Sequence, residues 1–178
     1  MLRVGLIGLG GIGRYHLTRY RQVPEAQVVA VADVRAPALR GDPDLAALFE
    51  VPAEEVRWFA DYCDLLASGA VDAVDICLPT DLHCPAATAA LAAGLHALVE
   101  KPMALTLADC DTMLAAAASS GRVLMVAHCI RFWPEYQYLA DLVRSGEAGR
   151  LLSLQMSRQG RRPMGASAGW MGRVDRSG

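Results

Sequence analysis

The sequence predicts an α/β fold in which helices cover both faces of a doubly wound parallel sheet. Short apolar segments rich in β-branched residues alternate with longer helix-like segments along most of the chain. Such apolar segments are typical of parallel strands that are buried on both faces, and the alternation indicates successive β-α-β units. The 178-residue length and the 53% hydrophobic content suit one domain of this kind and part of a second.

Six segments have the composition of buried strands, beginning with RVGLIG at the N-terminus. The expected strands cover residues 3–8, 26–33, 56–59, 71–78, 95–100 and 122–128. Helices are expected between them, over residues 12–22, 61–67, 84–94 and 106–121. Thr106 is a suitable N-cap for the last helix, and Gly94 and Gly121 stand where glycine commonly ends a helix.

The pattern changes after His128. Residues 131–149 are expected to form one longer helix that ends at Gly146 and Gly149, and residues 150–159 are expected to form a strand. A single strand can neither bury itself nor pair its backbone groups. We therefore expect residues 1–130 to form the sheet domain. We expect residues 131–178 to form the incomplete start of an α+β second domain.

Charge and cysteine content narrow the class of function. The net charge is −2, and the arginine-rich end of the chain has neither a basic helix nor interleaved aromatic residues, so no nucleic-acid partner is expected. No signal peptide or bilayer-length apolar segment is present, so we expect a cytoplasmic protein without a membrane partner.

The five cysteines are odd in number and lack CxxC spacing, which indicates reduced thiols. Two His-Cys pairs, at 83–84 and 128–129, lack zinc-ligand spacing, so we expect no metal.

A glycine-rich turn follows the first expected strand and opens the first helix. It carries glycines at 8, 10 and 13 in G-x-G-x-x-G spacing, and the next strand ends in Asp33, 20 residues after the last of them. This is the context of a dinucleotide-binding fingerprint, with phosphates on the helix N-terminus and the acidic residue on the ribose. A plain glycine turn with a surface aspartate is the alternative. The cofactor-binding residues expected here are Gly8, Gly10, Gly11, Ile12, Gly13, Asp33, Val34 and Arg35.

The cofactor expected at this turn is NAD. Asp33 would accept hydrogen bonds from both ribose hydroxyls and would repel a 2′-phosphate, which makes NADP the less suitable ligand. Arg35 opposes this preference, because it could pair with a 2′-phosphate.

Two further loops are expected at the same edge of the sheet, where ligands of open α/β sheets bind. The loop after the fourth strand supplies donors near the expected nicotinamide position, although His83 could equally be structural. The EKP segment follows the fifth strand. The cofactor-binding residues expected in these loops are Leu78, Pro79, Thr80, His83, Glu100, Lys101 and Pro102.

Lys101 is the only lysine in the chain, and all other basic side chains apart from histidine are arginine. Arginine stays charged at any relevant pH, whereas a lysine can have its pKa lowered and exchange a proton. A chain that otherwise uses arginine therefore keeps its lysine where arginine cannot serve. We expect Lys101 to be catalytic, the alternative being a surface lysine at a strand end.

Four segments carry a more specific signal: GLGGIGRYH, DAVDICLPTDLH, AALAAGLHALVEKPMALTLADCDTML and VLMVAHCIRFWPEY. In these segments, and in their order, the chain resembles the N-terminal half of the Gfo/Idh/MocA family of NAD(P)-dependent sugar and cyclitol oxidoreductases. The resemblance implies that Lys101 contacts the reacting hydroxyl and the nicotinamide ribose. It also implies that Arg131, in an R-F-x-P turn, borders the cofactor.

Members of this family continue into a second domain that binds substrate and forms the oligomer, and that domain supplies a histidine that works with the lysine. His16, His96 and His128 are not placed to replace it. The resemblance therefore implies a dehydrogenase that transfers a hydride between a secondary alcohol of a sugar or polyol and nicotinamide, with little activity in these 178 residues. A homo-oligomer would form through the second domain. A non-catalytic NAD-binding module is the alternative.

Overall fold

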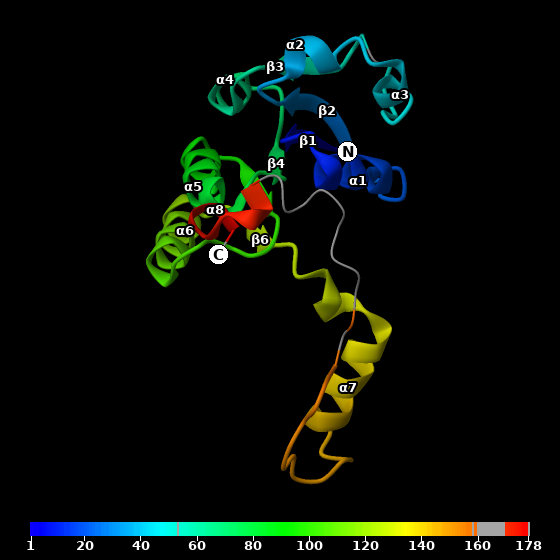
Figure 1. The fold of residues 1–178 in the computed structure, drawn as a ribbon, viewed down its shortest axis with the longest axis vertical. Helices are drawn as coiled ribbons and strands as arrows, with labels where there is room; N and C mark the ends of the chain where they lie inside the picture. Colours follow the sequence, from blue (N-terminus) through cyan, green and yellow to red (C-terminus); the bar gives the residue numbers. More distant parts are fainter. Residues whose placement is uncertain (53, 158, 160–169, 178) are drawn as a thin grey trace.

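The computed structural model describes residues 1–52, 54–157, 159 and 170–177. Within them, one sheet has the strand order β3-β2-β1-β4-β5-β6, and every neighbouring pair is parallel (Figure 1). The strands are β1 (Leu2–Ile7), β2 (Ala26–Ala32), β3 (Arg57–Phe59), β4 (Ala73–Ile76), β5 (His96–Val99) and β6 (Leu124–Val126). The order reverses direction between β1 and β4, so the predicted doubly wound sheet is confirmed.

The helices follow the strands in the expected alternation. They are α1 (Gly11–Tyr20), α2 (Ala36–Leu39), α3 (Pro43–Ala46), α4 (Tyr62–Ala67), α5 (His83–Ala92), α6 (Leu107–Ser120), α7 (Pro134–Arg144) and α8 (Val174–Ser177). The described residues also form short 3₁₀ turns, namely η1 (Thr80–Leu82), η2 (Cys129–Phe132) and η4 (Trp170–Gly172). The short helices α2, α3 and α8 and the turns η1 and η4 were not expected from the sequence.

The ends of α6 show why the sequence located this helix well. The Thr106 hydroxyl accepts a hydrogen bond from the Asp109 backbone N–H at 3.1 Å, which satisfies one free donor of the first turn. Gly121 follows the last turn with φ 64°, a left-handed conformation that glycine adopts without steric cost. Both signals are local in the sequence, so they fix the helix without reference to the rest of the fold.

Two apolar cores lie on opposite faces of the sheet, because successive strand side chains point to opposite sides. On one face, β4 and β5 pack against α4, α5 and α6, and the alanines of α5 let that helix lie close to the strands. On the other face, β1 and β2 pack against α1, α2 and α3. The second face, called the α1 face below, receives the side chains of Asp75 in β4 and Leu98 in β5, whose strand neighbours Val74, Ile76, Ala97 and Val99 belong to the first core.

The chain after β6 departs from two expectations. The long helix expected over 131–149 is shorter, because η2 comes first and α7 begins at Pro134. The strand expected over 150–159 is wrong, since residues 151–157 have no strand pairing. An extended segment becomes a strand only beside another strand edge, and this segment runs beside α7 instead, away from the sheet (Figure 1). None of the described helices is long and apolar enough to cross a membrane.

The core on the α5 and α6 side gives a test of the fold. Met113 is fully buried in α6, whereas its neighbour Leu114 is 56% exposed. We expect Met113→Ala to lower the free energy of unfolding in urea by about 2–5 kcal/mol, because it leaves a cavity in a packed core. Leu114→Ala is the matched control and should change it by less than about 1 kcal/mol. Equal losses in the two variants would contradict the assigned face of α6.

Candidate functional site

The glycines of the first turn have separate structural roles. Gly8 has φ 91°, and a Cβ added there would lie 2.6 Å from the carbonyl oxygen of Cys77. A Cβ at Gly13 would collide with the carbonyl oxygen of Gly8, so α1 can lie this close to β1 only with glycine at that position. A Cβ at Gly10 or Gly11 would meet nothing within 4 Å. The turn is therefore closed on its inner side and open on its outer side.

The N-terminus of α1 opens onto that free space. Gly10 is the N-cap and makes no side-chain capping bond, and the first turn contains no acidic residue. Its N–H groups and the positive end of the helix dipole therefore face outward, where an anion is favoured. Ile12, which is 39% exposed, lies in this turn. The open glycines and the uncapped helix fit a dinucleotide pyrophosphate.

Asp33 stands directly after β2, beside the glycine turn. Its carboxylate accepts hydrogen bonds from the backbone N–H of Leu9 and of Arg35, both at 2.8 Å, and forms an ion pair with the Arg35 guanidinium at 3.1 Å. Burial alone would raise the pKa of Asp33, but the guanidinium and the two amides lower it below its usual value. Arg35 is half exposed and folds onto Asp33, while Val34 points into solvent at 86% exposure. The acid expected to bind ribose is thus held ionised at the predicted position.

The loops after β4 and β5 are joined by His83. This histidine is 1% exposed, and its Nδ1 lies 2.8 Å from the carbonyl oxygen of Pro102 while its Nε2 lies 2.9 Å from that of Leu78. Thr80 is also buried, whereas Leu78 and Pro79 are half-buried. The sequence left two roles open for His83, structural or lining the cofactor site, and these contacts support the structural role.

Lys101 lies at the carboxyl end of β5, exposed to solvent. Its backbone N–H donates to Oε2 of Glu100 at 2.9 Å, and its side chain is free of the core. Arg131 lies in η2, exposed, on the segment that leads from the sheet toward α7 (Figure 1). The structure thus brings the glycine turn, Asp33 and the EKP segment to one edge of the sheet, with Arg131 beyond it.

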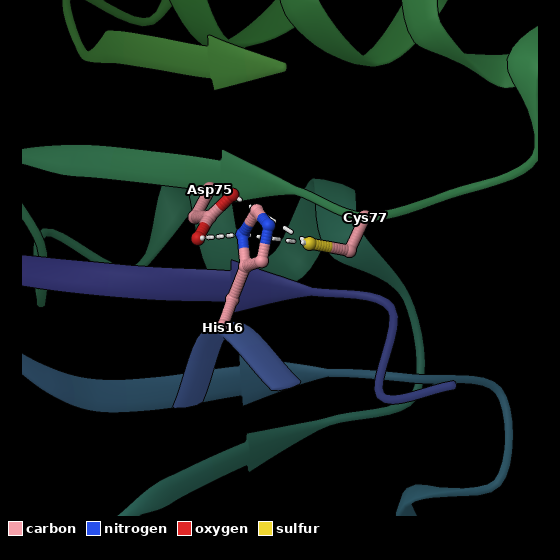
Figure 2. Close-up of side chains that lie close together, drawn as sticks. All are labelled: His16, Asp75 and Cys77. Carbon is pink, nitrogen blue, oxygen red and sulfur yellow. Dashed lines mark hydrogen bonds and ion pairs between the residues drawn. The ribbon is translucent and has the colours of Figure 1, made fainter. Parts of the chain in front are cut away.

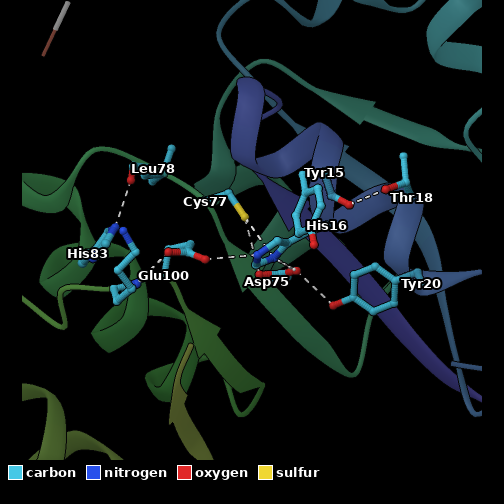
Figure 3. A network of polar contacts seen from close by, with 10 residues as sticks. Tyr15, His16, Thr18, Tyr20, Asp75, Cys77, Leu78, His83 and Glu100 are labelled. Atoms are coloured by element: carbon cyan, nitrogen blue, oxygen red, sulfur yellow. Dashed lines mark hydrogen bonds and ion pairs between the residues drawn. The ribbon is translucent and has the colours of Figure 1, made fainter. Parts of the chain in front are cut away.

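A buried polar network beneath this edge was not expected from the sequence. His16 of α1 places Nδ1 2.9 Å from Oδ2 of Asp75 and Nε2 3.1 Å from Oε1 of Glu100. Tyr20 donates its hydroxyl to the same Asp75 oxygen at 3.1 Å (Figure 3). Cys77 lies beside them, with Sγ 3.4 Å from His16 Nδ1 (Figure 2). One signal was available: Asp75 interrupts an apolar strand, and a buried carboxylate requires a partner.

The pKa shifts of the side chains in this network agree with their burial and hydrogen bonds. Burial lowers the pKa of His16, but hydrogen bonds with Asp75, Cys77 and Glu100, and the charge of Asp75, outweigh it and raise that pKa to about 12. Burial raises the pKa of Glu100, but the bonds from His16 and the Lys101 amide bring it below its usual value. Burial is the main cause that raises the pKa of Cys77 to about 12 and the pKa of Tyr20 above its usual value. His16 is therefore an imidazolium between two carboxylates, with a neutral thiol and phenol beside it.

Three side chains of this network, His16, Asp75 and Cys77, also form a candidate metal cluster, since their ligand atoms lie within 4.8 Å of one another. Ligand atoms on a tetrahedral zinc lie roughly 3.3 Å apart, because each stands about 2 Å from the metal. The 2.9 Å between His16 Nδ1 and Asp75 Oδ2 is instead a hydrogen-bond separation. The geometry therefore favours a hydrogen-bonded network.

A cavity of about 560 Å³ opens beside the network on the α1 face. It runs along α1 and over the middle of β5 and β6, where Leu98 and Met125 line it. None of its lining residues belongs to the expected cofactor site. The cavity is thus a separate feature from the glycine turn.

The His16 network predicts a pH-dependent stability. A group whose pKa is raised on folding contributes stability in full below its unfolded pKa, near 6.5, and loses it as pH rises toward the folded value of about 12. We expect the difference in unfolding free energy between the wild type and His16→Ala to be largest below pH 6.5. It should fall by up to about 1.4 kcal/mol per pH unit above that. Urea titrations from pH 6 to pH 9 measure it, and a difference that grows with pH would contradict the charged state.

Curated relatives match the chain over most of its length. It is 33% identical over 153 residues to the inositol 2-dehydrogenase of Salmonella typhimurium, an alignment that covers 85% of this chain and 44% of the relative. It is 37% identical over 139 residues to the UDP-N-acetylglucosamine 3-dehydrogenase of Acidithiobacillus ferrooxidans, covering 78% and 40%. The chain thus spans less than half the length of these relatives.

Solved structures agree with this comparison. The WlbA dehydrogenase of Bordetella pertussis, solved in complex with NADH and UDP-GlcNAcA, is similar with a TM-score of 0.72 and 29% identity, covering 84% of this chain and 43% of that one. Residues 2–128 match the model of the Gfo/Idh/MocA group, described as an oxidoreductase family with an NAD-binding Rossmann fold. The matched segment contains the glycine turn, Asp33 and Lys101. This chain belongs to the Gfo/Idh/MocA oxidoreductase family.

Proposed function

We propose that this chain is the cofactor-binding part of an NAD-dependent oxidoreductase that acts on a secondary alcohol of a sugar or polyol. The observation that carries the proposal is the open space over Gly10 and Gly11, at an uncapped helix N-terminus, with Asp33 beside it. Lys101 stands after β5, at the same edge of the sheet. Cofactor and reacting group would therefore meet there.

The binding roles follow from the chemistry of each group. The N–H groups of the first turn of α1 would hold the pyrophosphate, because they have no side-chain acceptor. The ionised carboxylate of Asp33 would accept the ribose hydroxyls, which requires Arg35 to give up part of its present contact. This pairing favours NAD over NADP, since a 2′-phosphate would face the Asp33 charge.

Lys101 would handle the proton of the reaction. The chemistry that bound nicotinamide would supply is acceptance of the hydride from the alcohol carbon, and the hydroxyl proton would then have to go to a base. A lysine in its neutral amine form can take such a proton, whereas arginine stays charged and cannot. The exposed side chain of Lys101 is free to contact a hydroxyl, while its backbone is fixed by Glu100.

The substrate class rests on the relatives. Two of them are named for dehydrogenation of inositol and of UDP-N-acetylglucosamine, and in each name the reacting position is a ring carbon that bears a hydroxyl. We extend that class, a ring hydroxyl of a sugar or cyclitol, to the protein from which this chain comes. Oligomer formation would involve the part of the relatives that this chain does not span.

Calorimetric titration with NADH tests the cofactor site. We expect NADH to bind the wild type, and Gly10→Val to weaken that binding by about tenfold or more, since its side chain fills the space of the pyrophosphate. Gly41→Val is the control, because Gly41 is also exposed with nothing within 4 Å of an added Cβ. Binding that is absent in the folded wild type, or equal in both variants, would refute the proposed site.

The choice of cofactor gives a second test. Asp33→Ser removes the ribose acceptor and leaves the Arg35 guanidinium without its carboxylate partner. We expect NADH binding to weaken by about tenfold, and NADPH binding to strengthen as Arg35 becomes available to the 2′-phosphate. The double variant Asp33→Ser/Arg35→Ala should lose the gain for NADPH. An unchanged ratio of the two affinities in Asp33→Ser would contradict the assigned role of Asp33.

A further inference from the structure

Asp75 reaches the α1 face from β4, and Glu100 reaches it from the position directly after the neighbouring strand β5. Leu98 and Glu100 are two residues apart, so both side chains point to the side opposite Val99, which lies in the α5 and α6 core. The Glu100 backbone N–H bonds to the carbonyl oxygen of Ile76, which continues the pairing of β4 and β5 to the sheet edge. Two carboxylates thus lie on one face, one in β4 and one directly after β5, with side chains only 1% and 11% exposed.

His16 is the described cation that contacts both carboxylates. A neutral imidazole donates only one hydrogen bond, so two carboxylate acceptors, one at each ring nitrogen, require the doubly protonated ring. Removal of one partner from a buried ion cluster leaves an uncompensated charge, which is strongly unfavourable. Without His16, the Glu100 carboxylate would have to turn toward water or take up a proton.

Glu100 uses its second oxygen for a different partner. Oε1 faces His16 (Figure 3). Oε2 accepts the backbone N–H of Lys101. On the other side of Lys101, His83 faces the carbonyl oxygen of Pro102 at 2.8 Å. The backbone around Lys101 is therefore held at both ends, and one of the two supports depends on the orientation of Glu100.

We propose that His16 is a positioning residue for Lys101 and acts through the Glu100 carboxylate. His16 fixes the carboxylate, and the carboxylate fixes the amide of Lys101 at the end of β5. The proposal rests on the proposed function in one respect, namely that Lys101 is the group whose position matters. The contacts themselves are independent of any cofactor.

The single lysine allows a direct test. A chain labelled with [15N]lysine gives one backbone amide signal, that of Lys101. A hydrogen bond to a carboxylate moves an amide proton signal downfield and slows its exchange with water. We expect Glu100→Ala to move the Lys101 signal upfield and to speed exchange by about tenfold, the factor expected for loss of a hydrogen bond to a charged group.

Two substitutions at His16 separate positioning from packing. The amide nitrogen of asparagine stands where Nδ1 of histidine stands, so His16→Asn can still donate to Asp75 but not to Glu100. The amide nitrogen of glutamine stands near the place of Nε2, so His16→Gln can still donate to Glu100. We expect His16→Asn to change the Lys101 signal as Glu100→Ala does, and His16→Gln to leave it close to the wild-type position.

His96→Gln is the control, because His96 stands on the same face of the sheet as Glu100, at the far end of β5, where its ring accepts a hydrogen bond from the Val123 N–H. It should leave the Lys101 signal unchanged, and His16→Asn should add no further change in the Glu100→Ala background. A wild-type signal in folded His16→Asn would overturn the proposal. If His16→Asn does not fold, His16→Gln decides, since a displacement as large as that of Glu100→Ala would also overturn it.

These measurements need no cofactor, so failure of the proposed function would be seen separately. NADH is added afterwards to the labelled wild type. A displaced Lys101 signal supports a cofactor site at this edge, whereas an unmoved signal counts against that site and leaves the positioning result intact.

Discussion

The close contact between α1 and the sheet is the constraint on which the candidate site depends. Gly13 allows it, because any side chain there would strike the Gly8 carbonyl oxygen. The same approach sets the α1 N-terminus over the open glycines and carries His16, one turn later on the same side of the helix, to the ends of β4 and β5. One glycine therefore couples the expected phosphate site to the buried network.

That network is better understood as a device for position than for stability. Two carboxylates and one imidazolium lose hydration when they are buried, and their mutual attraction often only offsets this loss. What they do provide is direction, because the two His16 nitrogens face different carboxylates and each Glu100 oxygen has its own partner. A hydrophobic trio of the same volume would pack as well but would leave the Lys101 amide without an ionised acceptor.

The sequence predicts those parts of the molecule whose signals are local. Buried strands, the glycine turn, the Thr106 cap and Gly121 are each specified within a few residues, and the structure has them where expected. The His16 network joins residues 59 and 84 positions apart, and it becomes visible only when the face of each strand is known. The strand expected after α7 was wrong for a related reason, since extended composition does not supply a pairing edge.

The position of Lys101 depends on the contacts that hold its backbone. A lysine side chain is long and flexible, so its head group is only as well placed as the backbone that carries it. At the end of β5 the sheet no longer holds that backbone, and polar side chains take over: Glu100 at the amide of Lys101 and His83 at the carbonyl of Pro102. Glu100 is in turn held from α1, the helix that would bind the cofactor phosphates. Under the proposed function, the cofactor and the proton-exchanging group would thus both depend on α1, and His16 would act on their site although it lies outside the cofactor edge.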